Sequence, residues 1–132
     1  MKTQITTNKL RQPNGHFSQA TTVEARGKLV FISGMTARTP DGTIAGIGNV
    51  EIQTRQVCEN LKAAVEAAGC TMDDIVRVDV YVRNMEHFEI IHKVRREYFR
   101  PPAPASTMFE ICKMTSPDYL IEINAIAVLP NA

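Results

Sequence analysis

The sequence carries little net charge and contains no long apolar segment. Its 15 lysines and arginines nearly balance its 14 aspartates and glutamates, giving a formal net charge of +1 over 132 residues. Such a chain lacks the strongly basic composition typical of proteins that bind nucleic acid or anionic lipid. No apolar run approaches the ~18 residues of a membrane span, and the polar residues 1–18 contain no signal-peptide core. We therefore expect one cytoplasmic domain over residues 1–132, with no nucleic-acid or membrane partner.

Motifs for cofactors and metals are also missing. Cys58, Cys70 and Cys112 are odd in number and form no CxxC pair, which favours reduced, mostly buried thiols. The three histidines show no HExxH or other paired metal-ligand spacing. The glycine-containing residues 44–48 match neither GxGxxG nor a P-loop. We expect no cofactor and no bound metal.

Two segments have the periodicity of amphipathic helices. The first is predicted to begin after the capping residue Asn49 and to end before Gly69. The second covers residues 86–99 and ends before two prolines. Its basic residues 93, 95 and 96 are interpreted as a solvated face. Apolar residues at helical spacing define the buried faces: Val57, Leu61, Ala64, Val65 and Ala68 in the first, and Ile91, Val94 and Tyr98 in the second.

Five segments are typical of strands: residues 18–25, 28–33, 75–83, 106–111 and 119–129. Arg26 and Gly27 predict a hairpin between the first two, and valines at 76, 78, 80 and 82 mark one face of the third. The order ββαβαββ predicts an α+β domain with two helices on one face of a single mixed sheet. Because the sheet is too apolar to leave its other face in water, we expect self-association.

Three residues are candidates for chemistry on local grounds. Glu122 lies mid-strand between two isoleucines, where a partly desolvated carboxylate suits proton transfer. A carboxylate on a solvated sheet face, or one in a salt bridge at a subunit interface, is slightly favoured on the sequence alone. His92 is either a proton-transfer group or an ordinary helix residue. Ser106 opens a strand without the GxSxG turn of a catalytic serine, which favours a structural hydroxyl.

Several segments, taken in order, resemble the Rid family, also called YjgF/YER057c/UK114. Residues 15–20 (GHFSQA) resemble its GPYSQA segment, and residues 29–34 (LVFISG) resemble its second strand. The same holds for residues 53–61 in the first helix, for 80–85 at the third strand, and for 104–105 and 121–123 in the C-terminal signature. The resemblance runs from about Gly15 to Val128. Residues 33–46 are also similar to the 2-aminomuconate deaminase branch of the family.

The resemblance implies a chorismate-mutase-like fold that assembles as a homotrimer around a barrel-like centre, with substrate clefts between neighbouring subunits. It also implies hydrolysis of a reactive imine, formed from an enamine, to a carbonyl compound and ammonia. In that scheme an arginine grips the substrate carboxylate with two parallel hydrogen bonds. A glutamate on the last strand directs the attacking water.

This chain matches only part of that site. Glu122 occupies the glutamate position, and Gly34 is the glycine at which the backbone approaches the ligand. The signature Pro-Ala-Arg is Pro104-Ala105-Ser106 here, so Ser106 stands where the arginine is expected. A charge-assisted hydrogen bond contributes roughly 1.5–3 kcal/mol, so losing two of them lowers binding or rate by about 10²–10⁴-fold. A small anionic substrate such as 2-aminoacrylate should therefore be processed poorly.

Two other positions of the site also differ from the family pattern. Phe17 replaces the tyrosine of GPYSQA, and His92 replaces an asparagine that is common in the second helix. His92, if cationic, and Arg38, just beyond the glycine, are the candidate replacements for the missing arginine. Phe17, Gly34, Arg38 and Ser106 are thus expected to bind substrate, and Glu122 and His92 to catalyse.

The leading hypothesis is deamination of an imine or enamine that differs from 2-aminoacrylate. A protein that binds a small metabolite without converting it, or that regulates through such binding, explains the missing arginine with fewer assumptions. Ribonuclease activity, attributed to some family members, is disfavoured because the chain is nearly neutral and shows no basic surface with interleaved aromatic residues.

Overall fold

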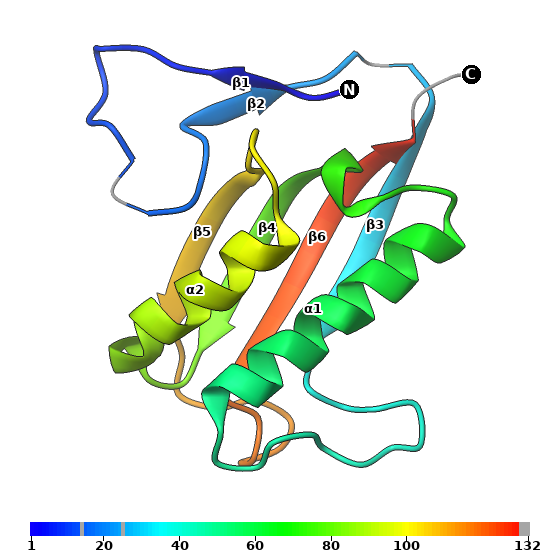
Figure 1. Cartoon of the computed structure of the whole chain (residues 1–132), viewed down its shortest axis with the longest axis vertical. Helices are drawn as coiled ribbons and strands as arrows, with labels where there is room; N and C mark the ends of the chain where they lie inside the picture. The colour runs from blue at the N-terminus through cyan, green and yellow to red at the C-terminus, as the bar shows by residue number, and fades with distance from the viewer. Residues whose placement is uncertain (14, 25, 130–132) are drawn as a thin grey trace.

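The computed structural model describes residues 1–13, 15–24 and 26–129, and these form an α+β fold (Figure 1). The elements in chain order are β1 (Thr3–Ile5), β2 (Ala20–Thr22), β3 (Lys28–Met35), α1 (Val50–Ala67), the 3₁₀ helix η1 (Met72–Asp74), β4 (Ile75–Val82), the 3₁₀ helix η2 (Met85–His87), α2 (Phe88–Tyr98), β5 (Ala105–Glu110) and β6 (Ile121–Leu129). The α+β class predicted from the sequence is confirmed.

Helix α1 begins and ends at the residues that the sequence predicts. The Asn49 side chain accepts a hydrogen bond of 3.0 Å from the Ile52 amide, which satisfies a free donor of the first turn. Gly69 has a φ of 86°, the left-handed conformation that ends helices, and its amide donates to the Glu66 carbonyl. Val57, Leu61 and Val65 are fully buried. Ala64 and Ala68 on the same face are half-buried.

Helix α2 is preceded by η2, so the predicted helix 86–99 starts as a 3₁₀ turn. The Asn84 side chain caps this turn by accepting from the Glu86 amide. Ile91 and Val94 are fully buried, as the periodicity predicts. Tyr98 is half-buried and donates a hydrogen bond to Glu59 on α1.

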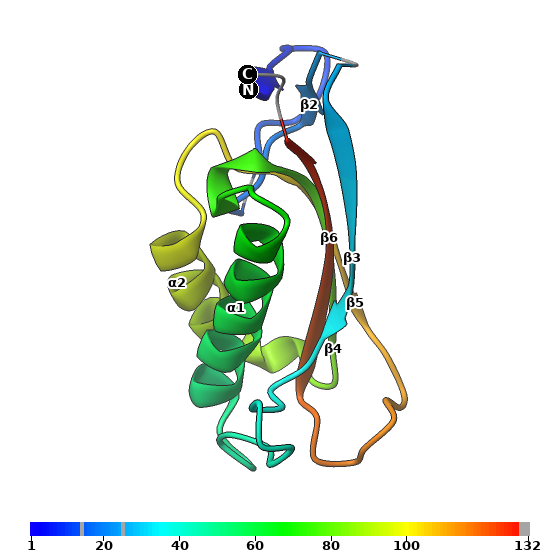
Figure 2. The same ribbon diagram turned by 90° about the vertical axis from the view of Figure 1, so that its right-hand side faces the viewer.

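The main sheet has four strands in the order β3-β6-β4-β5. The β4–β5 pair is parallel, and the β3–β6 and β4–β6 pairs are antiparallel. Helices α1 and α2 both lie on one side of this sheet (Figure 2). A shift in register between Ile75 and Arg77 removes Val76 from the predicted buried face. Val78, Val80 and Val82 keep that face and are fully buried.

The N-terminal strands differ from the prediction. The hairpin predicted between residues 18–25 and 28–33 does not form in the described part of the chain, and residue 25 lies outside the described residues. Instead, β2 pairs with β1 in a separate two-stranded sheet, so the single sheet predicted from the sequence is wrong. β3 pairs with β6 from Lys28–Leu129 to Met35–Ile123. That longer apolar partner offers more cross-strand contacts than the short, polar β2.

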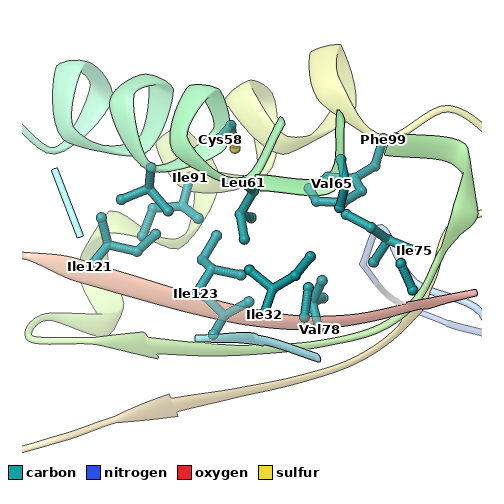
Figure 3. Packing of buried hydrophobic residues seen from close by; sticks show 14 of the residues in the cluster. Ile32, Cys58, Leu61, Val65, Ile75, Val78, Ile91, Phe99, Ile121 and Ile123 are labelled. Atoms are coloured by element: carbon teal, nitrogen blue, oxygen red, sulfur yellow. The ribbon is translucent and has the colours of Figure 1, made fainter. Parts of the chain in front are cut away.

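The core lies between the helices and the main sheet (Figure 3). Burying one such aliphatic side chain contributes about 1.5–3 kcal/mol relative to its exposure, so the helices are held mainly by this layer. Its largest fully buried aliphatic members come from α1, β4, α2 and β6: Leu61, Ile75, Ile91, Ile121 and Ile123.

The opposite face of the sheet is not covered by any helix of the described chain (Figure 2). Phe31 on β3 is 72% exposed and Phe109 on β5 is 52% exposed. Phe31 pairs with Ile126, and the Phe109 ring stacks on Tyr81 at 6.3 Å. We call this surface the open face. No helix within the described ranges has the length and apolar character needed to cross a membrane.

Candidate functional site

The six residues singled out in the sequence lie in three separate places. Phe17, His92 and Ser106 line one pocket, where the N-terminal segment crosses α2 and β5. Glu122 and Gly34 meet on β6 and β3. Arg38 lies in the loop between β3 and α1. A single subunit therefore does not bring the six residues together.

Glu122 lies on the open face of the sheet. Its neighbours Ile121 and Ile123 are fully buried against the helices, so the alternation of the strand directs the half-buried Glu122 the other way. A Cβ added to Gly34 would lie 2.8 Å from the Glu122 Cδ, and closer still to Oε2. The carboxylate thus lies across β3 in the space that the missing side chain leaves. A side chain at residue 34 would therefore displace the Glu122 carboxylate, and the assignment of both residues to the site stays a prediction.

Ser106 faces the helices, on the other side of the sheet from Glu122. It pairs with the fully buried Val78, and its Oγ accepts a hydrogen bond of 2.9 Å from Arg95 Nη2 on α2. The positions on β5 that share the open face with Glu122 are 105, 107 and 109, because successive residues of a strand face opposite ways. Thr107 Oγ1 accepts from Arg77 Nη2 at 2.8 Å, in agreement with this orientation. The β5 residues on Glu122's face are therefore an alanine, a threonine and a phenylalanine, and none of them supplies a cation.

Arg95 is buried, which corrects its interpretation as part of a solvated helix face. Only 2% of the residue is exposed. Desolvation lowers the pKa of its guanidinium to about 10, which still leaves it cationic at neutral pH. Its Nε has no hydrogen-bond partner, and no carboxylate of the described residues lies within ion-pair distance of it. The guanidinium carbon lies 6.0 Å from the centre of the Phe99 ring, a weak cation–π contact.

His92 is also buried, with 4% of the residue exposed. Burial, together with the positive charges of Arg95 and Arg96 and nearby His16, lowers its pKa from 6.5 to about 4. A neutral His92 at pH 7 is therefore expected, which contradicts its assignment as a replacement cation. Its Nε2 accepts from the His16 amide at 3.0 Å, so the hydrogen-bond pattern assigns the ring proton to Nδ1. Nδ1 itself makes no hydrogen bond, although the Phe88 carbonyl one turn earlier slightly favours protonation.

The pocket that contains Arg95 and His92 has a volume of about 150 Å³. Its walls are the rings of Phe17 and Phe88, the Met108 side chain and the three polar groups of His92, Arg95 and Ser106. Gly15 lies at its edge, and a Cβ there would come within 2.7 Å of His92 Nε2. A side chain at residue 15 would therefore require the His92 ring to shift.

Arg38 holds its own loop in place. Its Nε donates a hydrogen bond of 2.7 Å to the Tyr119 hydroxyl, its guanidinium lies 5.5 Å from the centre of the Tyr119 ring, and Nη1 donates to the Gly42 carbonyl. These contacts account for the side chain without a ligand. They place Arg38 away from the Arg95 pocket of the same subunit, and its proposed role in substrate binding remains a prediction.

The sequence contained a signal for Arg95 that its charge obscured. Arg95 follows Ile91 by four residues, and residues at this spacing share one face of a helix. Its basic neighbours at 93 and 96 are exposed, as predicted. Among the described residues, no group of three or more histidines, cysteines or acidic residues is arranged to hold a metal ion.

Comparison with known proteins gives consistent matches over nearly the whole chain. The family model described as Endoribonuclease L-PSP matches residues 6–129. A RutC family protein of Pyrococcus horikoshii is 39% identical over 127 residues, covering 96% of this chain and 98% of the relative. A protein of Dermatophagoides farinae named 2-iminobutanoate/2-iminopropanoate deaminase is 32% identical, covering 95% of this chain and 94% of the relative.

Solved structures agree with these sequence matches. A crystal structure of a protein of the conserved Rid family from Yersinia pestis superposes with a TM-score of 0.88 at 28% identity, covering 97% of this chain and 98% of the other. A member of the YjgF/YER057c/UK114 family from Mycobacterium tuberculosis gives a TM-score of 0.69 at 27% identity, with 86% of each chain covered. With the matching fold and the ordered segments already described, this chain belongs to the Rid (YjgF/YER057c/UK114) family.

Proposed function

We propose that the protein hydrolyses a reactive imine or enamine to a carbonyl compound and ammonia, in a cleft between subunits, with Glu122 as the residue that activates water. The observation that carries this proposal is the Glu122 carboxylate on the open face, in the space left by Gly34. The relative from Dermatophagoides farinae that is named 2-iminobutanoate/2-iminopropanoate deaminase supports the reaction class. Family membership supports it by analogy.

The proposed reaction needs only water and one proton-transfer group. An enamine first tautomerises to its imine. Glu122 accepts a proton from water as the water oxygen bonds to the imine carbon, and the electrons of the C=N π bond pass to nitrogen, which is protonated. The C–N bond of the resulting carbinolamine then breaks, the hydroxyl oxygen forms the carbonyl, and its proton leaves with nitrogen as ammonia. One water is consumed, and no cofactor or metal takes part.

A homotrimer is the proposed assembly, since the open face needs a partner. Phe31 and Phe109 are exposed on it in the isolated subunit, and apolar surface of this kind marks a protein interface. Contact between copies would set Glu122 of one subunit against residues of its neighbour. The cytoplasm is the proposed compartment because the free thiols of Cys58 and Cys70 suit a reducing environment.

The proposed substrate differs from 2-aminoacrylate. The open-face residues of β5 are Ala105, Thr107 and Phe109, and none of them offers a bidentate grip on a carboxylate. Arg77 shares this face, but Asp79 Oδ1 lies 2.8 Å from its Nη2 and neutralises it. Another group must therefore bind an anionic substrate, or the substrate has no carboxylate near the reacting carbon.

The test is ammonia release from freshly generated imines and enamines of graded size and charge. Wild type is compared with Glu122→Gln and with Glu66→Gln, an exposed carboxylate of α1 that serves as the control. We expect Glu122→Gln to lose about 10²–10⁴-fold in rate and Glu66→Gln to lose nothing. Turnover that survives in Glu122→Gln would refute the mechanism. A ligand that raises the melting temperature but is recovered unchanged would favour the alternative of a metabolite-binding protein.

A further inference from the structure

The Arg95 pocket has the composition of a binding site for an anion. Its polar lining consists of Arg95, Ser106 and His92, none of which is acidic, and the rest of its wall is apolar. Its volume of about 150 Å³ corresponds to roughly five water molecules at ~30 Å³ each. That is space for an organic acid of a few carbon atoms.

The buried guanidinium is the main element of this site. Arg95 comes from α2 and reaches the pocket next to Ser106, with Nε unpaired and one hydrogen bond made by Nη2. Proteins rarely bury an arginine without a counter-ion, because desolvation of the charge is costly. The nearby Cys58 does not neutralise it, since burial raises the pKa of that thiol to about 12. The position of the counter-ion is thus unoccupied by any described residue.

Ser106 adds a further donor. Its Oγ accepts from Arg95, which leaves its hydroxyl hydrogen free to donate to a ligand. His92 accepts through Nε2 from the His16 amide, and its buried Nδ1 lies near the Phe88 carbonyl, so the ring forms part of the wall. A ligand group that only accepts hydrogen bonds, as a carboxylate does, matches this set.

The apolar wall suits the remainder of the same ligand. Phe17, Phe88 and Met108 line the pocket beside the donors. Phe88 packs on the His92 ring with centres 4.0 Å apart. A short hydrocarbon chain attached to the carboxylate would contact these groups and leave water.

We propose that this pocket binds the carboxylate of a small organic acid through the Arg95 guanidinium on α2. The pocket and Glu122 of the same subunit lie on opposite faces of the sheet, so carboxylate binding here does not depend on imine turnover. Arg95 then selects for a single carboxylate carried on a short apolar chain.

Isothermal titration calorimetry on the full chain tests the proposal with two stable probes of the same shape. One is 2-oxobutanoate, which carries a carboxylate and belongs to the class of acids that deamination releases; the other is the neutral ketone 2-butanone. Wild type should bind 2-oxobutanoate and should bind 2-butanone at least about 10-fold more weakly. Equal affinity for the two probes, or no binding of 2-oxobutanoate, would overturn the proposal without any variant.

Variants then locate the site. Arg95→Met replaces the buried cation by an apolar chain of similar length and should fold, and Arg95→Lys keeps the charge but loses the planar fork. Arg96→Met on the exposed side of α2 is the matched control. We expect Arg95→Met to bind 2-oxobutanoate about 10–150-fold more weakly, Arg95→Lys to fall between, and Arg96→Met to match wild type.

The two proposals fail in different ways. Unchanged affinity in both Arg95 variants would refute carboxylate binding here, even if imine turnover were established. Arg95-dependent binding of 2-oxobutanoate without turnover of any imine would support the pocket and refute the deaminase.

Discussion

Gly34→Ala tests the contact between Gly34 and Glu122 at the proposed catalytic site. The added methyl group would lie 2.8 Å from the Glu122 Cδ and 3.0 Å from its Cγ, closer than real Cβ atoms approach other atoms. The carboxylate must therefore move by on the order of 1 Å, and a displacement of this size can cost about 10²-fold in rate. We expect kcat/KM for ammonia release to fall by that factor. The free energy of unfolding should change by less than about 1 kcal/mol, because the displaced group is a flexible side chain.

Gly42→Ala is the matched control for this change. Gly42 has a φ of 90°, and nothing lies within 4 Å of the added Cβ. Alanine in this left-handed conformation costs roughly 1–2 kcal/mol, so the control should lose stability and keep activity, the reverse of Gly34→Ala. Urea denaturation and the ammonia assay measure both quantities on both proteins. Full activity in Gly34→Ala, together with activity that depends on Glu122, would refute the argument that this contact positions the carboxylate.

Three further predictions follow from burial and strand orientation. Ser106→Arg would set a second cation against the buried Arg95 and should lower the free energy of unfolding by about 3–5 kcal/mol. The arginine of Ala105→Arg would project from the open face, so this variant should change the melting temperature little. Equal changes in melting temperature for the two variants would contradict the assigned strand orientation. The pKa of His92 is lowered to about 4 in the folded protein, so on acidification this residue binds a proton in the unfolded chain first. The contribution of His92 to the free energy of unfolding should therefore be fully present above pH 6.5, fall by at most about 3 kcal/mol as the pH drops to 4, and then level off. Partial solvent screening makes the loss smaller. His92→Gln should flatten this profile in urea titrations at several pH values, and an unchanged slope would assign it to other groups. Phe31→Lys should dissociate the assembly in sedimentation equilibrium by charging the open face, while an unaltered mass would place the interface elsewhere.

The regular elements were largely predictable because their signals are local. Asn49 and Gly69 bound α1 through side-chain capping and a left-handed backbone, both of which depend on neighbouring residues alone. The alternation in β4 and the periodicity of α1 and α2 predicted the buried faces for the same reason. The partner of β2 was not predictable in this way, since strand pairing depends on which distant segment offers the larger apolar contact.

The candidate site was predictable only in part. Residue type and family resemblance pointed to Glu122 and Gly34, and the structure places them in contact. The structure brings Ser106 into one pocket with His92 and Phe17. The sequence could not show that its side chain faces α2 and not Glu122, because an offset of one residue along a strand reverses the face.

The sequence by itself determined the family, the α+β class, the signals that bound α1 and a carboxylate on the last strand. Those properties depend on residue identity and short-range spacing. Only the tertiary structure decided that Arg95 is a buried cation without a counter-ion and that His92 is neutral. Both follow from desolvation by segments far apart in the chain: residues 15–17, α2 and β5 meet around these two side chains, and burial of a charge depends on all of its neighbours at once.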